Sequence, residues 1–216
     1  QLIERYGDYE TPLKFQRLAG ILDSNVREGR KTLVWSNFVR NLRTLQREFT
    51  ALQPALVYGG VPSGDPDAEL LTREAEIRRF REDPSCHVLL ANPACLAEGI
   101  SLHRECRDAV YVDRTFNAGQ YLQSLDRIHR LGLDPSIETR IHVLIAGGTV
   151  DEVVNFRLAK KIGWLEDVLE DRSLREMSLP DEEEEGIPLD ALEDVQALLA
   201  HLRGDHHGKN NAAVTT

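Results

Sequence analysis

Short apolar runs alternate along the chain with longer segments whose apolar residues recur every three or four positions. The runs lie at residues 31–36, 54–60, 87–92, 108–113 and 139–146. They are continuously apolar rather than alternating, which is typical of strands that are buried on both faces of a parallel sheet. We therefore expect these five runs to be strands of a mostly parallel sheet.

The segments between the runs have the periodicity and the end signals of helices. We expect one helix to begin at Thr11-Pro12 and to stop at Gly29, and another to carry one apolar face made of Phe38, Leu42, Leu45 and Phe49. Further helices are predicted over residues 70–81 and 117–131, and from the Thr149–Glu152 capping box to about residue 169. Strands alternating with helices predict an α/β fold with helices on both faces of the sheet.

Ligands of such sheets bind beyond the carboxyl ends of the strands. The loops after Ser36, Gly59, Asn92 and Asp113 are therefore the candidate binding loops. Residues 61–68, VPSGDPDA, are rich in turn residues and are predicted to form an exposed loop.

We expect three regions along the chain: a domain over residues 1–170, an acidic linker with an amphipathic helix over 171–203, and a disordered tail over 204–216. The linker contains the run DEEEE. The helix is a C-terminal appendage that needs a surface to bury its stripe of Leu189, Leu192, Val195, Leu199 and Leu202. The His206-His207 pair in the tail is interpreted as incidental, and no metal site is predicted.

The net charge of −10 is unevenly spread. Residues 171–216 hold 4 basic and 11 acidic side chains, whereas residues 1–170 hold 22 and 25, so the body is nearly balanced. Nucleic-acid binding by the body is therefore not excluded. The three cysteines form no CxxC pair and no apolar run could span a bilayer, which predicts a cytoplasmic protein without a membrane partner. Because the chain begins with Gln1, we expect it to be a piece of a longer protein.

The stretch QSLDRIHRLG, residues 123–132, carries two arginines three positions apart. On a helix this spacing places Arg127 and Arg130 on one face. Such a pair either holds an acidic neighbour, as Asp126 could hold Arg130, or receives a phosphate.

Six motifs follow one another in the order KTLVWSNF, YGG, REAEIRRF, ANPACLAEGISL, DRTFN and QSLDRIHRLG. In this order and spacing they resemble the C-terminal RecA-like lobe of SWI/SNF-type DNA-dependent ATPases, within helicase superfamily two. The resemblance covers residues 31–169 and implies a RecA-like fold. It also implies a motor in which two RecA-like lobes sandwich ATP and Mg²⁺ and track along duplex DNA. The partner would be the N-terminal lobe of the same parent chain, which holds the phosphate loop and the metal-binding acidic pair.

The resemblance also implies roles for individual residues. Arg127 and Arg130 would be the catalytic groups that reach the nucleotide phosphates across the cleft. The residues implied in nucleotide binding are Gln123, Asp126, Glu98 and Gly99. Those implied in sequence-independent contact with the DNA backbone are Ser36, Asn37, Tyr58, Gly59 and Asn92.

Several alternatives stay open. Tyr58 could instead be a core aromatic at a strand end, and the arginines of 73–81 could form either a phosphate patch or a solvated face balanced by glutamates. The chain departs from the family pattern where Asn92-Pro93 opens its segment and where Leu133 follows QSLDRIHRLG.

The sequence contains no GxxxxGK[ST] phosphate loop and no acidic box of the kind that binds Mg²⁺ in such motors. The chain alone should therefore not hydrolyse ATP. Two other classes of function compete with the motor lobe. One is a non-catalytic RecA-like module that binds nucleic acid or protein. The other is a small-molecule enzyme on a doubly wound fold, for which the expected GxGxxG loop and GxSxG serine elbow are absent.

Overall fold

The computed structural model describes residues 11–67, 71–96, 100–128, 138–170 and 190–203, and among them the side chains of 164–170, 190–192, 197, 202 and 203 are left out. The chain forms two compact units, Gln1–Ala146 and Gly147–Thr216. The division falls before the helix at 150–170, which lies in the second unit.

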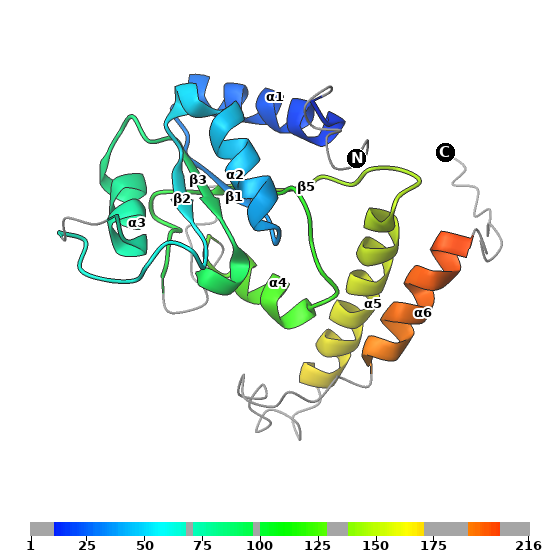
Figure 1. Cartoon of the computed structure of the whole chain (residues 1–216). Helices are drawn as coiled ribbons and strands as arrows, with labels where there is room; N and C mark the ends of the chain where they lie inside the picture. Colours follow the sequence, from blue (N-terminus) through cyan, green and yellow to red (C-terminus); the bar gives the residue numbers. More distant parts are fainter. Residues whose placement is uncertain (1–10, 68–70, 97–99, 129–137, 171–189, 204–216) are drawn as a thin grey trace. The chain divides into compact units, whose positions relative to one another are not determined.

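The first unit is built on a five-stranded sheet (Figure 1). Its strands are β1 (Thr32–Trp35), β2 (Ala55–Val57), β3 (Val88–Ala91), β4 (Asp108–Tyr111) and β5 (Arg140–Val143). They lie in the order β2-β3-β1-β4-β5, and every neighbouring pair is parallel. Each of the five apolar runs contains one strand, so the predicted α/β fold with a parallel RecA-like sheet is confirmed.

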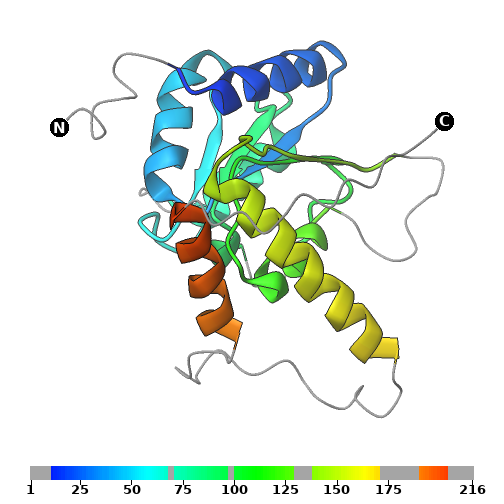
Figure 2. The same cartoon turned by 90° about the vertical axis from the view of Figure 1, so that its right-hand side faces the viewer.

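Successive residues of each strand face opposite sides of the sheet, which gives this unit two apolar cores. Leu33 and Trp35 of β1 belong to one core, together with residues of α3 (Arg73–Glu82). Tyr121 and Leu125 of α4 (Ala118–Leu125) pack against the same core. Val34 belongs to the other core, with residues of α1 (Leu13–Arg27) and α2 (Val39–Glu48). Helices therefore cover both faces, as predicted, and Figure 2 shows α1 and α2 on their shared side.

Two helix ends differ from the sequence-based expectation. Pro12 is the residue that precedes α1, and its carbonyl accepts hydrogen bonds from Phe15 and Gln16, whereas no side chain caps this end. Phe38 is 57% exposed and does not share the buried face of Leu42. The reason is that Phe38 is the extended residue before α2, so helical spacing does not apply to it.

Other boundaries agree with the local signals. Gly29 follows α1 with a φ of +68°, a conformation that glycine adopts without strain. The segment 61–67 is exposed except at Val61, which is buried, and Pro66, which is half-buried. Two 3₁₀ turns, η2 (Thr50–Leu52) and η3 (Pro93–Cys95), follow α2 and β3.

The second unit contains α5 (Val150–Glu170) and α6 (Asp190–Arg203), which pack against each other. Thr149 caps α5 through a hydrogen bond from the Asp151 N–H at 3.2 Å. Within the predicted stripe of α6, Val195 and Leu199 are 52% and 42% exposed. Among the helices described here, none is long and apolar enough to cross a membrane.

A buried ion cluster joins α5 to α6. Arg157 Nε lies 2.9 Å from Asp194 Oδ1, and Lys161 Nζ lies 2.6 Å from Asp194 Oδ2. The hydrogen bond from Arg157 to Asp194 raises the pKa of the guanidinium. A single carboxylate of α6 is therefore held by two cations of α5.

Candidate functional site

The candidate binding loops converge at one edge of the sheet. Because all five strands are parallel, their carboxyl ends lie on the same side. This edge carries Ser36 and Asn37 after β1, Tyr58 after β2, Asn92 after β3 and Asp113 after β4. The structure thus brings together loops that lie far apart in the sequence, as the fold class predicted.

Asp113 organises the loop that connects β1 to α2. Its carboxylate accepts hydrogen bonds from the Ser36 hydroxyl, from the Asn37 backbone N–H at 2.7 Å and from Asn41 Nδ2 at 3.1 Å. Asp113 is 8% exposed, so these donors replace the water that a carboxylate needs. We call this set the Asp113 cluster.

Asn92 holds the other side of the same loop. Its Nδ2 donates to the Asn37 carbonyl at 3.0 Å, while its Oδ1 accepts from the Ala94 N–H at 3.0 Å. Its backbone N–H donates to Val57 at the end of β2 at 2.9 Å. The backbone of Asn37 is therefore held by Asp113 on its N–H and by Asn92 on its carbonyl.

These bonds change what the predicted DNA-contacting residues can do. The side chain of Ser36 is fully buried and bonded to Asp113, and both polar ends of the Asn92 side chain bond within the protein. In this conformation Ser36 positions the loop and does not face solvent, whereas Asn92 is half-buried with its side-chain polar atoms bonded within the protein. Asn37 and Tyr58 are half-buried, and Gly59 is exposed, so these three present surface at the edge.

Tyr58 combines the two interpretations that the sequence left open. Its ring is half-buried and packs beside the core under α2. Its hydroxyl accepts a hydrogen bond from Arg43 Nη2 at 2.8 Å, and the guanidinium lies 5.3 Å from the ring centroid. A Cβ atom at Gly60 would lie 2.5 Å from the Tyr58 ring, so any larger residue at the second glycine of YGG would displace this ring.

The helix that leads to QSLDRIHRLG ends earlier than predicted. It stops at Leu125, with Asp126 as its C-terminal cap, whereas the sequence pattern predicted helix to residue 131. The carbonyl of Arg127 accepts from the Leu102 N–H at 2.8 Å, a partner outside the helix. Arg127 therefore lies in a turn after the helix, so the helical spacing that was used to pair it with Arg130 does not apply at Arg127.

Arg127 is a buried link in this structure. It is 8% exposed, and its Nη1 donates to the Ile100 carbonyl at 3.3 Å. Gln123 and Asp126 are exposed on or beside the helix. The remaining residues that were predicted to act on the nucleotide, Arg130, Glu98 and Gly99, lie outside the described residues.

Tyr111 fixes α4 on the sheet. Its hydroxyl lies 2.6 Å from Ser124 Oγ, and its ring contacts Tyr121 at a centroid distance of 4.9 Å. Burial raises the pKa of the Tyr111 hydroxyl, which therefore stays protonated at neutral pH. The start of the candidate phosphate-binding stretch is thus anchored to β4.

The arginines of α3 have partners within the protein. Arg73 donates to the Val61 carbonyl at 2.6 Å, and Arg81 to the Ser101 carbonyl at 2.8 Å. Arg78 pairs with Asp67 at 2.7 Å, while Arg79 pairs with Glu76 at 2.9 Å. These contacts favour a structural role over the phosphate patch that the sequence left as an alternative.

In the ranges that the structure covers, no three His, Cys, Asp or Glu side chains come together as metal ligands. The site offers hydrogen-bond donors and guanidinium groups, such as those of Arg43 and Arg127, which suit anionic ligands. Sequence reasoning named the loop after Asp113 but missed the carboxylate itself. The sequence feature that could have identified Asp113 is a lone acidic residue at the end of an apolar strand, together with a neighbouring loop rich in hydroxyl and amide side chains.

The fold is similar to that of known proteins. The structure is similar to the C-terminal part of the Fun30 ATPase domain, with a TM-score of 0.62 and 20% identity over 90% of this chain. It is also similar to the C-terminal domain of the Sulfolobus solfataricus SWI2/SNF2 ATPase, with a TM-score of 0.49 and 19% identity over 72% of this chain. The chain spans 55% and 59% of those two proteins. The helicase conserved C-terminal domain family matches residues 13–132, which is more than half of the chain, and the chain therefore belongs to that family.

Proposed function

We propose that this chain is the second motor lobe of an ATP-dependent DNA translocase of SWI/SNF type, working with an N-terminal RecA-like lobe. One observation carries the proposal: Arg127 is bonded to Ile100 and Leu102, so the candidate phosphate-binding stretch is joined to the segment after β3. A lobe that couples nucleotide to DNA needs such a link between its two ligand sites. Family membership and the ordered motifs support the same function.

The proposed chemistry is phosphoryl transfer to water, with ATP and Mg²⁺ held mainly by the other lobe. Phosphoryl transfer spreads negative charge over the equatorial oxygens, and a fixed guanidinium stabilises that charge. Arg130 and Arg127 are the groups that we assign to this role. Arg127 Nη1 donates to the neutral Ile100 carbonyl, and a phosphate oxygen is a stronger acceptor for a guanidinium because it carries negative charge.

The proposed DNA contacts are made at the strand-end edge by Asn37, Tyr58 and Gly59. Amide, hydroxyl and backbone N–H groups are suited to phosphate oxygens, which carry no base information. Hydrogen bonds from Ser36 to Asp113, and from Asp113 and Asn92 to the Asn37 backbone, fix the position of that surface. Binding by this lobe alone should therefore be weak, independent of sequence and sensitive to salt.

The arginines are tested in the complete parent protein. Arg130→Ala should lower DNA-stimulated ATPase activity on the order of 10³- to 10⁵-fold while leaving DNA affinity and melting temperature unchanged. Arg130→Lys should rescue little, because lysine keeps the charge but loses the planar fork. Arg127→Ala should lower both activity and stability, since its side chain is buried.

Near wild-type ATPase activity in Arg130→Ala would contradict the motor proposal for this residue. The same outcome in both single variants would favour the alternative, a non-catalytic RecA-like module that binds nucleic acid or protein. A phosphate-release assay on the isolated chain is the companion measurement, and turnover above background would contradict the assignment of ATP binding to a separate lobe.

A further inference from the structure

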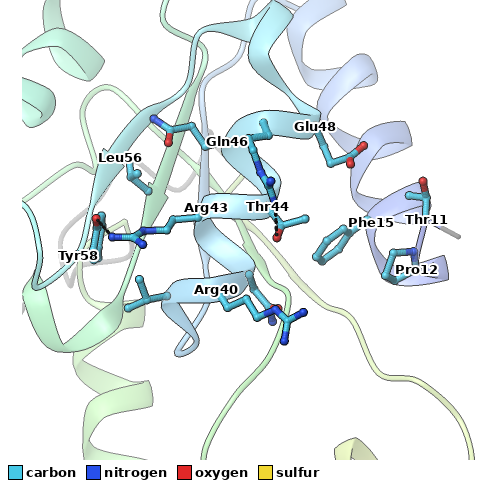
Figure 3. Close-up of a pocket in the computed structure, with 13 residues that line it drawn as sticks. Thr11, Pro12, Phe15, Arg40, Arg43, Thr44, Gln46, Glu48, Leu56 and Tyr58 are labelled. Carbon is cyan, nitrogen blue, oxygen red and sulfur yellow. Dashed lines mark hydrogen bonds between the residues drawn. The ribbon is translucent and has the colours of Figure 1, made fainter. Parts of the chain in front are cut away.

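A groove with a volume of about 860 Å³ opens between α1, α2 and β2 of the first unit. Figure 3 shows Phe15 of α1 on one side of it and Leu56 and Tyr58 of β2 and its end on the other. Arg40, Arg43 and Arg47 of α2 line it, and all three are exposed. We call it the α2 groove. Of the residues that line it, the proposed DNA contacts use only Tyr58.

The three arginines follow α2 at intervals of three and four residues, which places them on one face of the helix. At 1.5 Å per residue, they are displaced along the helix axis by about 4.5 and 6 Å. Glu48 is the single acidic residue among those that line the groove. The groove is thus a row of guanidinium groups with a net positive charge.

Two of the guanidinium groups are oriented by neighbouring side chains. Arg43 Nη2 donates to the Tyr58 hydroxyl at 2.8 Å, a bond drawn in Figure 3, and Arg43 Cζ lies 5.3 Å from the ring centroid. Arg47 Nη2 donates to Thr44 Oγ1 at 3.4 Å. Ordering of these long side chains before binding lowers the entropy that a ligand must overcome.

Tyr58 belongs both to the α2 groove and to the strand-end edge. In addition, α2 begins at Val39, two residues after Asn37, whose backbone is held by Asp113 and Asn92. The groove is therefore continuous with the edge that we assign to DNA. An extended ligand lying on Asn37 and Tyr58 reaches Arg43 without crossing another element.

The lining favours a phosphate backbone over an acidic peptide. Peptides that dock in grooves are usually anchored by apolar side chains. Of the apolar lining residues, Phe15 and Leu56 are each only 7% exposed, and Pro12 and Val39 are half-buried, so together they offer an anchor less surface than the three exposed arginines offer a phosphate. Guanidinium groups present paired N–H donors that match phosphate oxygens.

We propose that the α2 groove binds the phosphodiester backbone of DNA and extends the strand-end edge along Arg43, Arg40 and Arg47. This inference rests on the proposed DNA-tracking function and adds contacts to it. Each phosphate contact contributes about 0.9 to the slope of log K against log salt for B-form DNA. Three arginines should therefore account for a slope of about 2 to 3.

The test compares three variants of the whole chain by fluorescence anisotropy with a labelled duplex of mixed sequence at several salt concentrations. The groove variant is R40Q/R43Q/R47Q. The charge-matched control is R17Q/R27Q/R104Q, made at three exposed arginines that do not line the groove. The edge variant is N37A. Thermal melting establishes that each variant is folded.

At low salt we expect the groove variant to bind DNA with roughly 10- to 100-fold lower affinity than the wild type. Its slope of log K against log salt should be shallower by about 2 to 3. Both changes should be much smaller in the control. Equal losses in the groove variant and the control would overturn the inference, because general charge would then explain them. A groove variant that binds like the wild type, while N37A binds worse, would overturn the groove but keep the proposed edge. Loss in the groove variant alone would support the groove and count against the edge.

An acidic peptide is the other polyanion to be excluded. Polyglutamate is added as a competitor at the same concentration of negative charge as unlabelled duplex. We expect unlabelled duplex to displace the labelled DNA at lower concentrations. More effective displacement by polyglutamate, lost in the groove variant, would overturn the inference in favour of an acidic protein partner.

Discussion

The Asp113 cluster gives the sharpest prediction about how the binding edge is held. Asp113→Ala removes a carboxylate that accepts three hydrogen bonds, from Ser36, Asn37 and Asn41. The same change leaves both apolar cores intact, since Asp113 belongs to neither. Any loss of stability can therefore be assigned to the polar cluster.

The size of the loss depends on which donors can reach water. Ser36 is fully buried, so its hydroxyl loses a charged acceptor without replacement, at a cost of about 1.5–3 kcal/mol. Asn37 and Asn41 are half-buried, and water can substitute there, at roughly 0.5–1 kcal/mol each. We expect Asp113→Ala to lower the free energy of unfolding by about 3 kcal/mol, and Asp113→Asn by about 1 kcal/mol, since the amide oxygen still accepts from Asn37.

Trp35 is a local reporter for this measurement. It directly precedes Ser36, is fully buried and stacks on Tyr111 at a centroid distance of 6.3 Å. Urea unfolding is followed by its fluorescence with Trp164 replaced by phenylalanine, which leaves one tryptophan. With a slope near 2 kcal/mol per M urea, Asp113→Ala should lower the midpoint by about 1.5 M.

Asp67→Ala is the control, because Asp67 pairs with Arg78 at 2.7 Å but is 76% exposed and screened by solvent. Its midpoint should match the wild type. If Asp113→Ala also matched the wild type, the cluster would not stabilise the loop and the reasoning would be refuted. If Asp113→Asn and Asp113→Ala lowered the free energy of unfolding equally, the remaining amide acceptor would contribute nothing, which would contradict the hydrogen bonds described.

Two further predictions concern buried carboxylates. Asp194→Ala should weaken the packing of α6 on α5 by roughly 2–4 kcal/mol, because it removes the carboxylate that pairs with the buried Arg157. Glu193→Ala should cost under about 1 kcal/mol, because the Glu193 side chain is 61% exposed. Hydrogen exchange of the α6 amides measures both, and equal protection in the two variants would contradict the assignment. Burial raises the pKa of Asp108, so the native state keeps this proton to higher pH than the unfolded state. Stability should therefore fall as pH rises from about 4, the ordinary pKa of aspartate, through the raised native value. Asp108→Asn should reduce that slope in urea midpoints measured against pH, and an unchanged slope would contradict this origin.

The sequence alone determined the architecture of the first unit. Its five strands are continuous apolar runs because both faces of each are buried, and that property is local to each run. The end of α1 before Gly29 could also be predicted from the sequence, because it depends on the backbone preferences of one residue. The order of the six motifs also predicted the helicase C-terminal lobe, which the family match confirms.

Only the tertiary structure decided how the site is held. Asp113 bonds to Ser36 across 77 positions of sequence, and the carbonyl of Arg127 accepts a hydrogen bond from the Leu102 N–H rather than from a further turn of helix. The arginines of α3 pair with acceptors that include Val61 and Ser101, which no spacing rule would have selected. Hydrophobic periodicity reports which face of an element is buried. It carries no information on which distant donor or acceptor meets a polar side chain, because those partners are set by the packing of separate elements.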